Sequence, residues 1–101
     1  MRPVSLTDKQ RRHLRGLAHG LKPVIRVGQA GVSDAVVAET SRALEAHELI
    51  KVRVADMERA ERDAALASLA ARTDSEMVGR IGHTAILYRR HPKKPRIVVP
   101  G

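Results

Sequence analysis

Apolar residues recur along this chain with two periods, one typical of helices and one typical of strands. The first predicted helix opens at Leu6 and Thr7, and its apolar face holds Leu14, Leu17, Ala18 and Leu21. Thr7 and Gln10 fit a capping box at its start, and Gly20 with Pro23 ends it. The other side of this helix is basic and carries Arg12, Arg15, His19 and Lys22.

Two more helices are predicted further along the chain. Ser33 is suited to cap the second, which covers the sequence DAVVAETSRALEAHE. Its apolar positions are Val36, Val37, Thr40, Leu44 and His47. Asp56 is suited to cap a third, Ala-rich helix that runs to about Arg72. The apolar stripe of this helix is formed by Leu66, Leu69 and Ala70.

Four short segments between and after these helices have the character of strands. Residues 24–27 (VIRV) form a β-branched run, and residues 49–54 (LIKVRV) alternate between two faces. One face of the latter holds Ile50, Val52 and Val54, and the other holds Leu49, Lys51 and Arg53. The segments EMVGRI and TAILYR are joined by Gly82-His83, which predicts a hairpin with a type II′ turn.

The resulting order is α-β-α-β-α-β-β, an α/β fold with a four-stranded mixed sheet. We expect the helices mainly on one face of this sheet, so that the other face is partly open and leaves Lys51 and Arg53 accessible. Residues 1–90 form the predicted domain. Residues 91–101 are basic and rich in proline, which favours an extended arm over a packed element.

Charge narrows the choice of partner. The 101-residue chain has 19 Lys and Arg against 11 Asp and Glu, a net charge of +8, which favours a polyanion such as nucleic acid. Tyr88 is the sole aromatic residue, so contacts should run through phosphates and sugars and not through stacking platforms. There is no cysteine, no signal-peptide pattern and no membrane-spanning run, which predicts a cytoplasmic protein.

Catalysis and metal binding have no recognisable motif. The five histidines form neither an HExxH pair nor a couple spaced for a metal, and no GxSxG elbow is present. We therefore expect no enzymatic activity, no cofactor and no small-molecule substrate.

The sequence VGQAGVS places a Gly-x-x-G, residues Gly28, Gln29, Ala30 and Gly31, between a strand and the helix capped by Ser33. Glycines there let another backbone approach closely, and the free N–H groups of the helix start favour a phosphate. The same glycines also suit a strand-to-helix turn for its geometry alone. The tetrapeptide by itself leaves both interpretations open.

Several longer segments form one recognisable pattern: LKP before the first strand, VGQAGV, HELIKV and IGHTAILYRR. Together, over a match from about Leu6 to Arg90, they resemble the CRM domain (chloroplast RNA splicing and ribosome maturation), in particular its bacterial stand-alone YhbY-like form. The resemblance implies this fold, RNA binding with a Gly-x-x-G loop like that of KH domains, and association with precursor rRNA of the large ribosomal subunit. Relatives usually place a lysine where this chain has Gln29, so Lys22 or Arg26 is expected to supply the cation.

Other basic residues are candidates for the same RNA surface. On the first helix these are Arg11, Arg12 and Arg15, on the second strand Lys51 and Arg53, and after the last strand Arg89 and the cations of the tail. The arginines of the first helix could equally form an ordinary solvent-exposed helix face that contacts no RNA. Two other partners stay open: double-stranded DNA, or an acidic protein that this chain binds as an adaptor. We expect the chain to act as a monomer.

Overall fold

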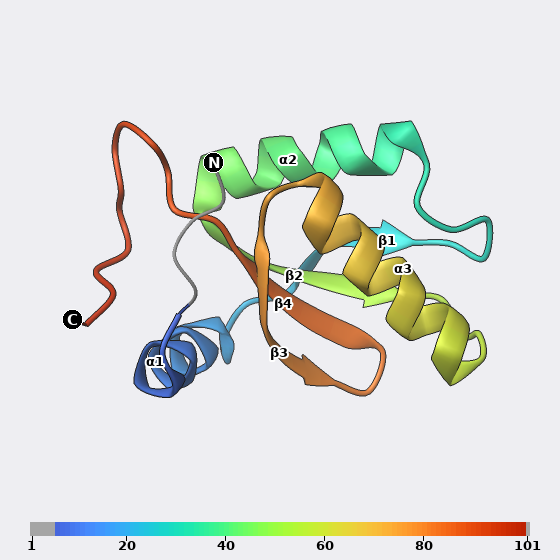
Figure 1. Cartoon of the computed structure of the whole chain (residues 1–101), viewed down its shortest axis with the longest axis horizontal. Coiled ribbons are helices and arrows are strands. Elements are labelled where there is room, and N and C mark those ends of the chain that lie inside the picture. Colours follow the sequence, from blue (N-terminus) through green and yellow to red (C-terminus); the bar gives the residue numbers. More distant parts are fainter. Residues whose placement is uncertain (1–5, 101) are drawn as a thin grey trace.

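The computed structural model describes residues 6–100 and contains the predicted elements in the predicted order. Figure 1 labels the elements α1 (Asp8–Ala18), β1 (Pro23–Val27), α2 (Asp34–His47), β2 (Leu49–Val54), α3 (Arg59–Arg72), β3 (Glu76–Ile81) and β4 (Thr84–Tyr88).

Two of the three predicted helix starts are confirmed. The Thr7 hydroxyl accepts a hydrogen bond from the Gln10 N–H at 3.1 Å, and the Gln10 side chain accepts one from the Thr7 N–H at 2.9 Å. Ser33 caps α2 by accepting from the Val36 N–H at 3.2 Å. The prediction for α3 was wrong, because this helix follows Glu58 and has no side-chain cap. Asp56 lies before it, too far along the chain to cap its first turn.

The sheet has the strand order β1-β2-β4-β3. Strands β1 and β2 are parallel, whereas β4 runs antiparallel to both β2 and β3. Gly82 has φ +59° at the first turn position of the β3–β4 hairpin, and His83 is not among the residues with positive φ. This combination fits the predicted type II′ turn and excludes type I′, which needs positive φ at both positions.

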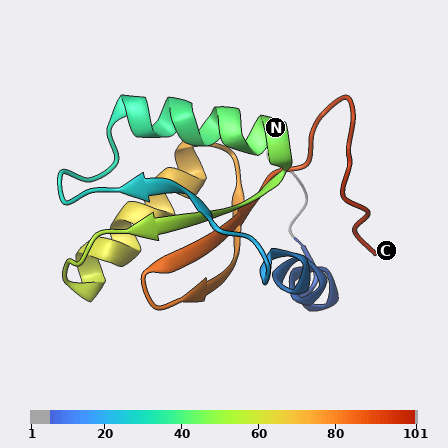
Figure 2. The same cartoon turned by 180° about the vertical axis from the view of Figure 1, so that it is seen from behind.

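Helices α2 and α3 cover one face of the sheet, and α1 lies on the other (Figures 1 and 2). Beneath α2 and α3 lies the larger core, built from Ile25, Val27, Leu44, Ile50, Val52, Val54, Leu66, Leu69, Ala85 and Leu87. Beneath α1 lies a smaller core, built from Leu14, Ala18, Leu49, Val78, Ile86 and Tyr88. The helices are thus mainly on one face, as predicted, and the opposite face is only half covered, by α1.

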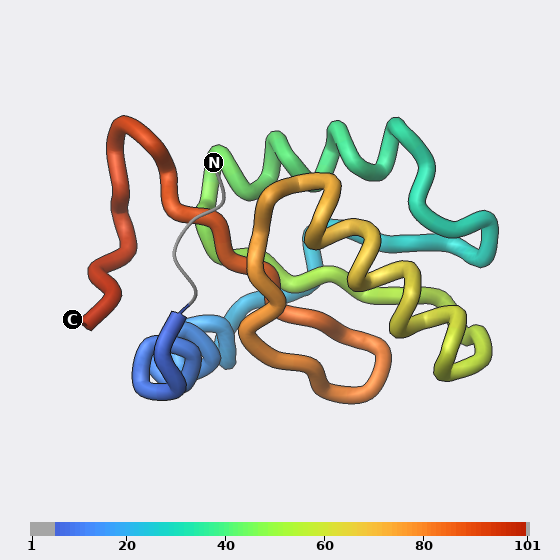
Figure 3. Tube along the Cα trace, in the orientation of Figure 1, coloured from blue at the N-terminus to red at the C-terminus, as the bar shows by residue number. Residues whose placement is uncertain are grey.

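Residues 91–100 of the tail form no helix or strand, but they do not make the extended, unpacked arm that the sequence favoured. It passes the C-terminal end of α2 and then turns toward α1 (Figure 3). The buried Glu48 carboxylate holds it by accepting hydrogen bonds from the backbone N–H groups of His91, Arg96 and Ile97, at 2.8, 2.6 and 2.9 Å. Further along, Ile97 packs on the smaller core together with Val99. A composition rich in proline and lysine did not reveal this, because the partner is a carboxylate more than 40 residues away.

Candidate nucleic-acid interface

The Gly-x-x-G forms a turn that leaves its outer side open. The Gly31 N–H donates to the Gly28 carbonyl at 3.0 Å, and Gly31 has φ +87°, a conformation that side chains strongly disfavour. A Cβ placed on Gly28 or on Gly31 would meet no atom within 4 Å. Gly31 is therefore needed for backbone geometry, whereas Gly28 leaves space without any such need.

Neighbouring side chains anchor this loop from two sides. The Gln29 side-chain amide donates to the Asp56 carbonyl at 3.0 Å, which ties the loop to the β2–α3 connection. On the other side, Arg72 of α3 donates to the Val32 carbonyl at 3.2 Å and pairs with the Asp34 carboxylate at 2.6 Å. Gln29 thus has an internal role. Arg72 also balances the acidic group nearest to the start of α2.

Two backbone donors beside this turn have no partner within residues 6–100. Ser33 uses its hydroxyl for the Val36 N–H and its carbonyl for the Val37 N–H. The earlier N–H groups of α2, those of Asp34 and Ala35, have no acceptor within residues 6–100. Unpaired amides at a helix start attract anions, because the helix dipole adds partial positive charge at the same place.

Two arginines stand side by side on the open half of the sheet next to this loop. Arg26 of β1 and Arg53 of β2 are register partners on neighbouring parallel strands, and both are exposed. Neither makes an ion pair within the described part of the chain. Like charges directly across two strands repel each other, so this pair lowers the stability of the fold unless an anion binds between the two guanidinium groups.

Lys51 and Arg53 lie on the same face and border a shallow cavity of about 300 Å³. Arg53 is exposed, and Lys51 is half-buried with its Nζ 3.4 Å from the His19 carbonyl. The prediction that this sheet face leaves both cations accessible is confirmed for Arg53 and in part for Lys51. Lys22 is exposed at the other end of β1, directly before the strand.

The cations of α1 are not part of this surface. Arg15 donates to the Val78 carbonyl at 3.0 Å, and Arg11 donates to the Met77 carbonyl at 2.9 Å and pairs with Glu76. Both side chains therefore dock α1 onto β3. Gly79 makes room for the Arg15 stem, since a Cβ there would lie 2.7 Å from the Arg15 Cδ. Arg12 is exposed, but α1 lies at the opposite end of the molecule from the Gly-x-x-G loop (Figure 1).

Arg89 is occupied inside the protein. Its guanidinium donates to the Ser41 hydroxyl at 3.1 Å, to the Ser41 carbonyl at 2.8 Å and to the Thr73 carbonyl at 2.9 Å. These bonds join the residue after β4 to the middle of α2 and to the C-terminal end of α3, so we leave Arg89 out of the interface. The roles of Arg72 and Arg89 could not be found from the sequence, because their partners lie far away along the chain.

The described part of the chain lacks two other features, a metal-binding cluster and a membrane-spanning helix. Within residues 6–100, no three histidine, cysteine or acidic side chains lie close enough to hold a metal ion. In the same range no helix combines the length and the apolar character needed to cross a bilayer.

The fold and its open Gly-x-x-G loop can now be compared with known proteins. A model of the CRS1/YhbY (CRM) domain matches residues 6–89. This chain belongs to the CRM domain family. The resemblance seen in its sequence motifs is therefore confirmed.

Individual relatives agree with this membership. The chain is 43% identical over 90 residues to a "Probable RNA-binding protein" of Pseudomonas aeruginosa, which covers 89% of this chain and 86% of the relative. It is 38% identical over 95 residues to the "Probable RNA-binding protein YqeI" of Bacillus subtilis, covering 94% and 99%. The solution structure of a Staphylococcus aureus protein, proposed there to bind RNA, aligns with a TM-score of 0.82 and 33% identity, covering 95% of this chain and all of that one.

Proposed function

We propose that this protein binds RNA through the Gly-x-x-G turn and the adjoining open half of the sheet. The observation that carries the proposal is the pair Arg26 and Arg53, two exposed cations without an ion pair among the described residues, held side by side next to an open glycine turn and a helix start with unpaired N–H groups. The names of the bacterial relatives support RNA as the polyanion.

The geometry fits recognition of the sugar-phosphate backbone. A phosphate near Gly28 would accept from main-chain N–H groups at the start of α2, and the following phosphates would pass over Arg26 and Arg53. Such contacts position a strand without reading its sequence. Binding of this kind releases counterions, so the affinity should fall steeply as salt rises.

The target that we propose is structured precursor rRNA of the large ribosomal subunit, bound during its assembly and without catalytic turnover. This choice follows the family's implied role and the net charge of +8. Crosslinking in cells followed by sequencing of the bound RNA tests it, and enrichment of other transcripts would contradict it. A monomeric state and a cytoplasmic location stay predictions, to be checked by light scattering and by fractionation.

The proposal is tested by removing the arginine pair. The double variant Arg26→Gln/Arg53→Gln should bind a structured RNA more weakly and reduce the slope of log affinity against log salt by about 2, one unit for each lost phosphate contact. The control is Arg42→Gln/Arg90→Gln, which removes the same charge from two exposed arginines on α2 and after β4. An equal loss in the control would point to net charge alone and contradict the site.

Competition distinguishes RNA from the other partners. Wild-type protein bound to structured RNA should resist displacement by duplex DNA at the same salt concentration. Preference for duplex DNA would overturn the proposal. Affinity that stays flat between about 50 and 200 mM salt would also overturn it, and would favour an acidic protein partner bound mainly by shape.

A further inference from the structure

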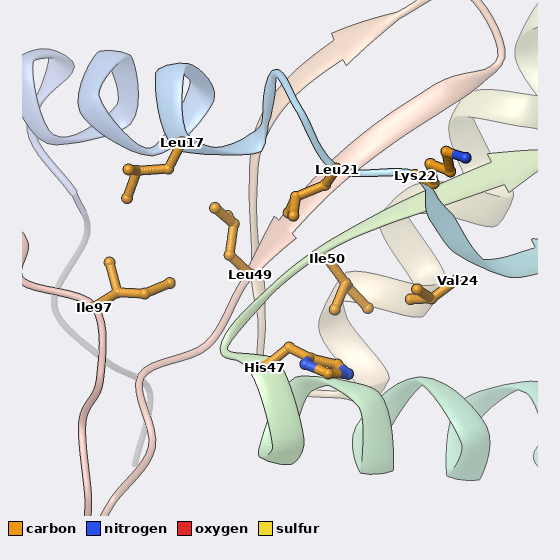
Figure 4. Close-up of a pocket in the computed structure, with 8 residues that line it drawn as sticks. All are labelled: Leu17, Leu21, Lys22, Val24, His47, Leu49, Ile50 and Ile97. Atoms are coloured by element: carbon orange, nitrogen blue, oxygen red, sulfur yellow. The ribbon is translucent and has the colours of Figure 1, made fainter.

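An apolar groove lies at the start of β1, between the end of α1, the end of α2 and the tail (Figure 4). Its volume is about 450 Å³. Large apolar side chains exposed in residues 6–100 are few, and three of them line this groove: Leu17 (46% exposed), Leu21 (40%) and Val24 (50%). The sequence placed Leu17 and Leu21 on the apolar face of the first predicted helix, but both side chains are exposed and Leu21 lies beyond the end of α1. Contiguous exposed apolar groups of this kind mark binding sites.

The groove lies next to the cationic surface along β1. Val24 lines the groove, Arg26 follows it two residues later on the same strand, and both are exposed. Lys22 adds a cation to the lining of the groove. None of the groove-lining residues is acidic. An apolar site and cationic sites thus alternate along one strand, with the Gly-x-x-G turn at its far end.

The backbone of β1 adds hydrogen-bonding capacity at this place. Within the described chain β1 pairs only with β2, so its outer edge has no strand neighbour. The register shifts between Pro23 and Ile25, and Val24 is left without a register partner. Unpaired N–H and C=O groups at a strand edge can bond to an extended ligand that lies along it.

An unpaired nucleotide combines the properties that this strand would recognise. Its base has two flat apolar faces and a polar edge, and its phosphate is an anion within reach of a cation beside the base. Aliphatic side chains contact the face of a base by dispersion, which requires no aromatic partner. A duplex has its bases stacked inside and cannot offer them to a groove.

We infer that the Leu21–Val24 groove takes unpaired bases of the RNA whose phosphates contact Arg26 and Arg53. The inference rests on the proposed function and adds to it a preference for looped or single-stranded segments within a structured RNA. The alternative occupant, an apolar segment of a protein, is decided by the same experiment.

The test compares two fluorescent probes of ten nucleotides. One is oligouridylate, and the other keeps the sugar-phosphate chain but has stable abasic residues in place of the bases. Wild-type protein should bind the oligouridylate about fivefold more tightly, equivalent to about 1 kcal/mol. The variant Leu21→Ser/Val24→Ser should bind both probes equally, with unchanged affinity for the abasic one.

A matched control uses the same chemical change elsewhere. Val98→Ser alters another exposed valine, on the tail and outside the groove lining, and should keep the fivefold preference. If Leu21→Ser/Val24→Ser unfolds, Leu21→Ser alone replaces it, because Leu21 lies in the α1–β1 connection and is 40% exposed. Circular dichroism establishes folding in each case.

The outcomes separate this inference from the proposed function. Equal binding of both probes by wild-type protein would overturn the inference, whereas the arginine-pair experiment would still stand. A groove variant that keeps its preference for bases would overturn it as well, and would leave the groove to a protein partner. Weaker RNA binding by the arginine variant, together with a fivefold preference for the oligouridylate in wild-type protein, supports both.

Discussion

Replacing Glu48 by glutamine tests how the tail is held. Glu48 is fully buried at the end of α2, and its carboxylate accepts three backbone N–H groups of the tail. The glutamine oxygen can still accept from Arg96 and Ile97, but its NH₂ group then faces the His91 N–H, donor against donor. One charge-assisted hydrogen bond is lost and two are weakened.

The expected loss of stability follows from these bonds. A hydrogen bond to a charged group contributes about 1.5–3 kcal/mol, so we expect Glu48→Gln to lower the free energy of unfolding by about 2–3 kcal/mol at pH 7. For a chain of this size that lowers Tm by roughly 10 °C or more. Glu45→Gln is the control, since it makes the same charge change on an exposed residue of the same helix.

The loss should depend on pH in a defined direction. Burial raises the pKa of Glu48, but the hydrogen bonds from His91, Arg96 and Ile97 together outweigh it, so the pKa lies below the ordinary value of 4.5. A carboxyl with a lowered pKa stabilises the fold fully above its unfolded-state pKa, and this contribution disappears as pH falls through the folded-state value. The difference between wild type and Glu48→Gln should therefore be full at pH 7 and shrink below about pH 4.5.

Urea unfolding followed by far-ultraviolet circular dichroism measures the difference at pH 7 and at pH 3. Trypsin provides a second measurement, because cleavage after Lys93 and Arg96 should be faster in Glu48→Gln than in Glu45→Gln if the tail is released. A difference below about 0.5 kcal/mol at pH 7, or one of the same size at both pH values, would refute this account of the tail.

Three further predictions concern single residues. Arg89→Lys should lower the free energy of unfolding by about 2 kcal/mol in urea titrations, because lysine cannot reach all the acceptors that the guanidinium bonds. The folded variant should bind RNA as tightly as wild type. Weaker RNA binding with unchanged stability would instead place Arg89 in the RNA interface. Gly31→Ala should lower the free energy of unfolding by about 1 kcal/mol, because alanine is strained at the positive φ of this position, whereas Gly28→Ala should lower it little. Equal losses of stability in the two variants would be inconsistent with the turn geometry. Burial and the nearby Glu48 charge raise the pKa of Tyr88 above 10.0. Its absorbance titration should therefore have a midpoint above 10.0, and the free energy of unfolding should fall as pH rises through that midpoint. A midpoint at or below 10.0 would contradict the burial of the phenol.

Much of the local structure could be predicted from the sequence. The capping box of Thr7 and Gln10, the Ser33 cap and the Gly82 turn each depend on residues within three or four positions, and all were predicted correctly. The alternation of LIKVRV likewise placed Arg53 on the open face of the sheet. Asp56 was assigned to the wrong position because several acidic and polar residues precede α3, and local patterns rarely distinguish between them.

The candidate site depends both on local sequence and on tertiary structure. The sequence by itself determined the order of the elements, the excess of cations and the position of the Gly-x-x-G, because periodicity, composition and turn chemistry are local properties. Only the tertiary structure decided which cations stay free: Arg26 and Arg53 become neighbours across two strands, whereas Arg15 and Arg89 bond to carbonyls brought close by folding. The groove and the docked tail also exist only in three dimensions. The groove gathers residues from Leu17 to Ile97, and Glu48 holds tail groups that are 43 or more residues away.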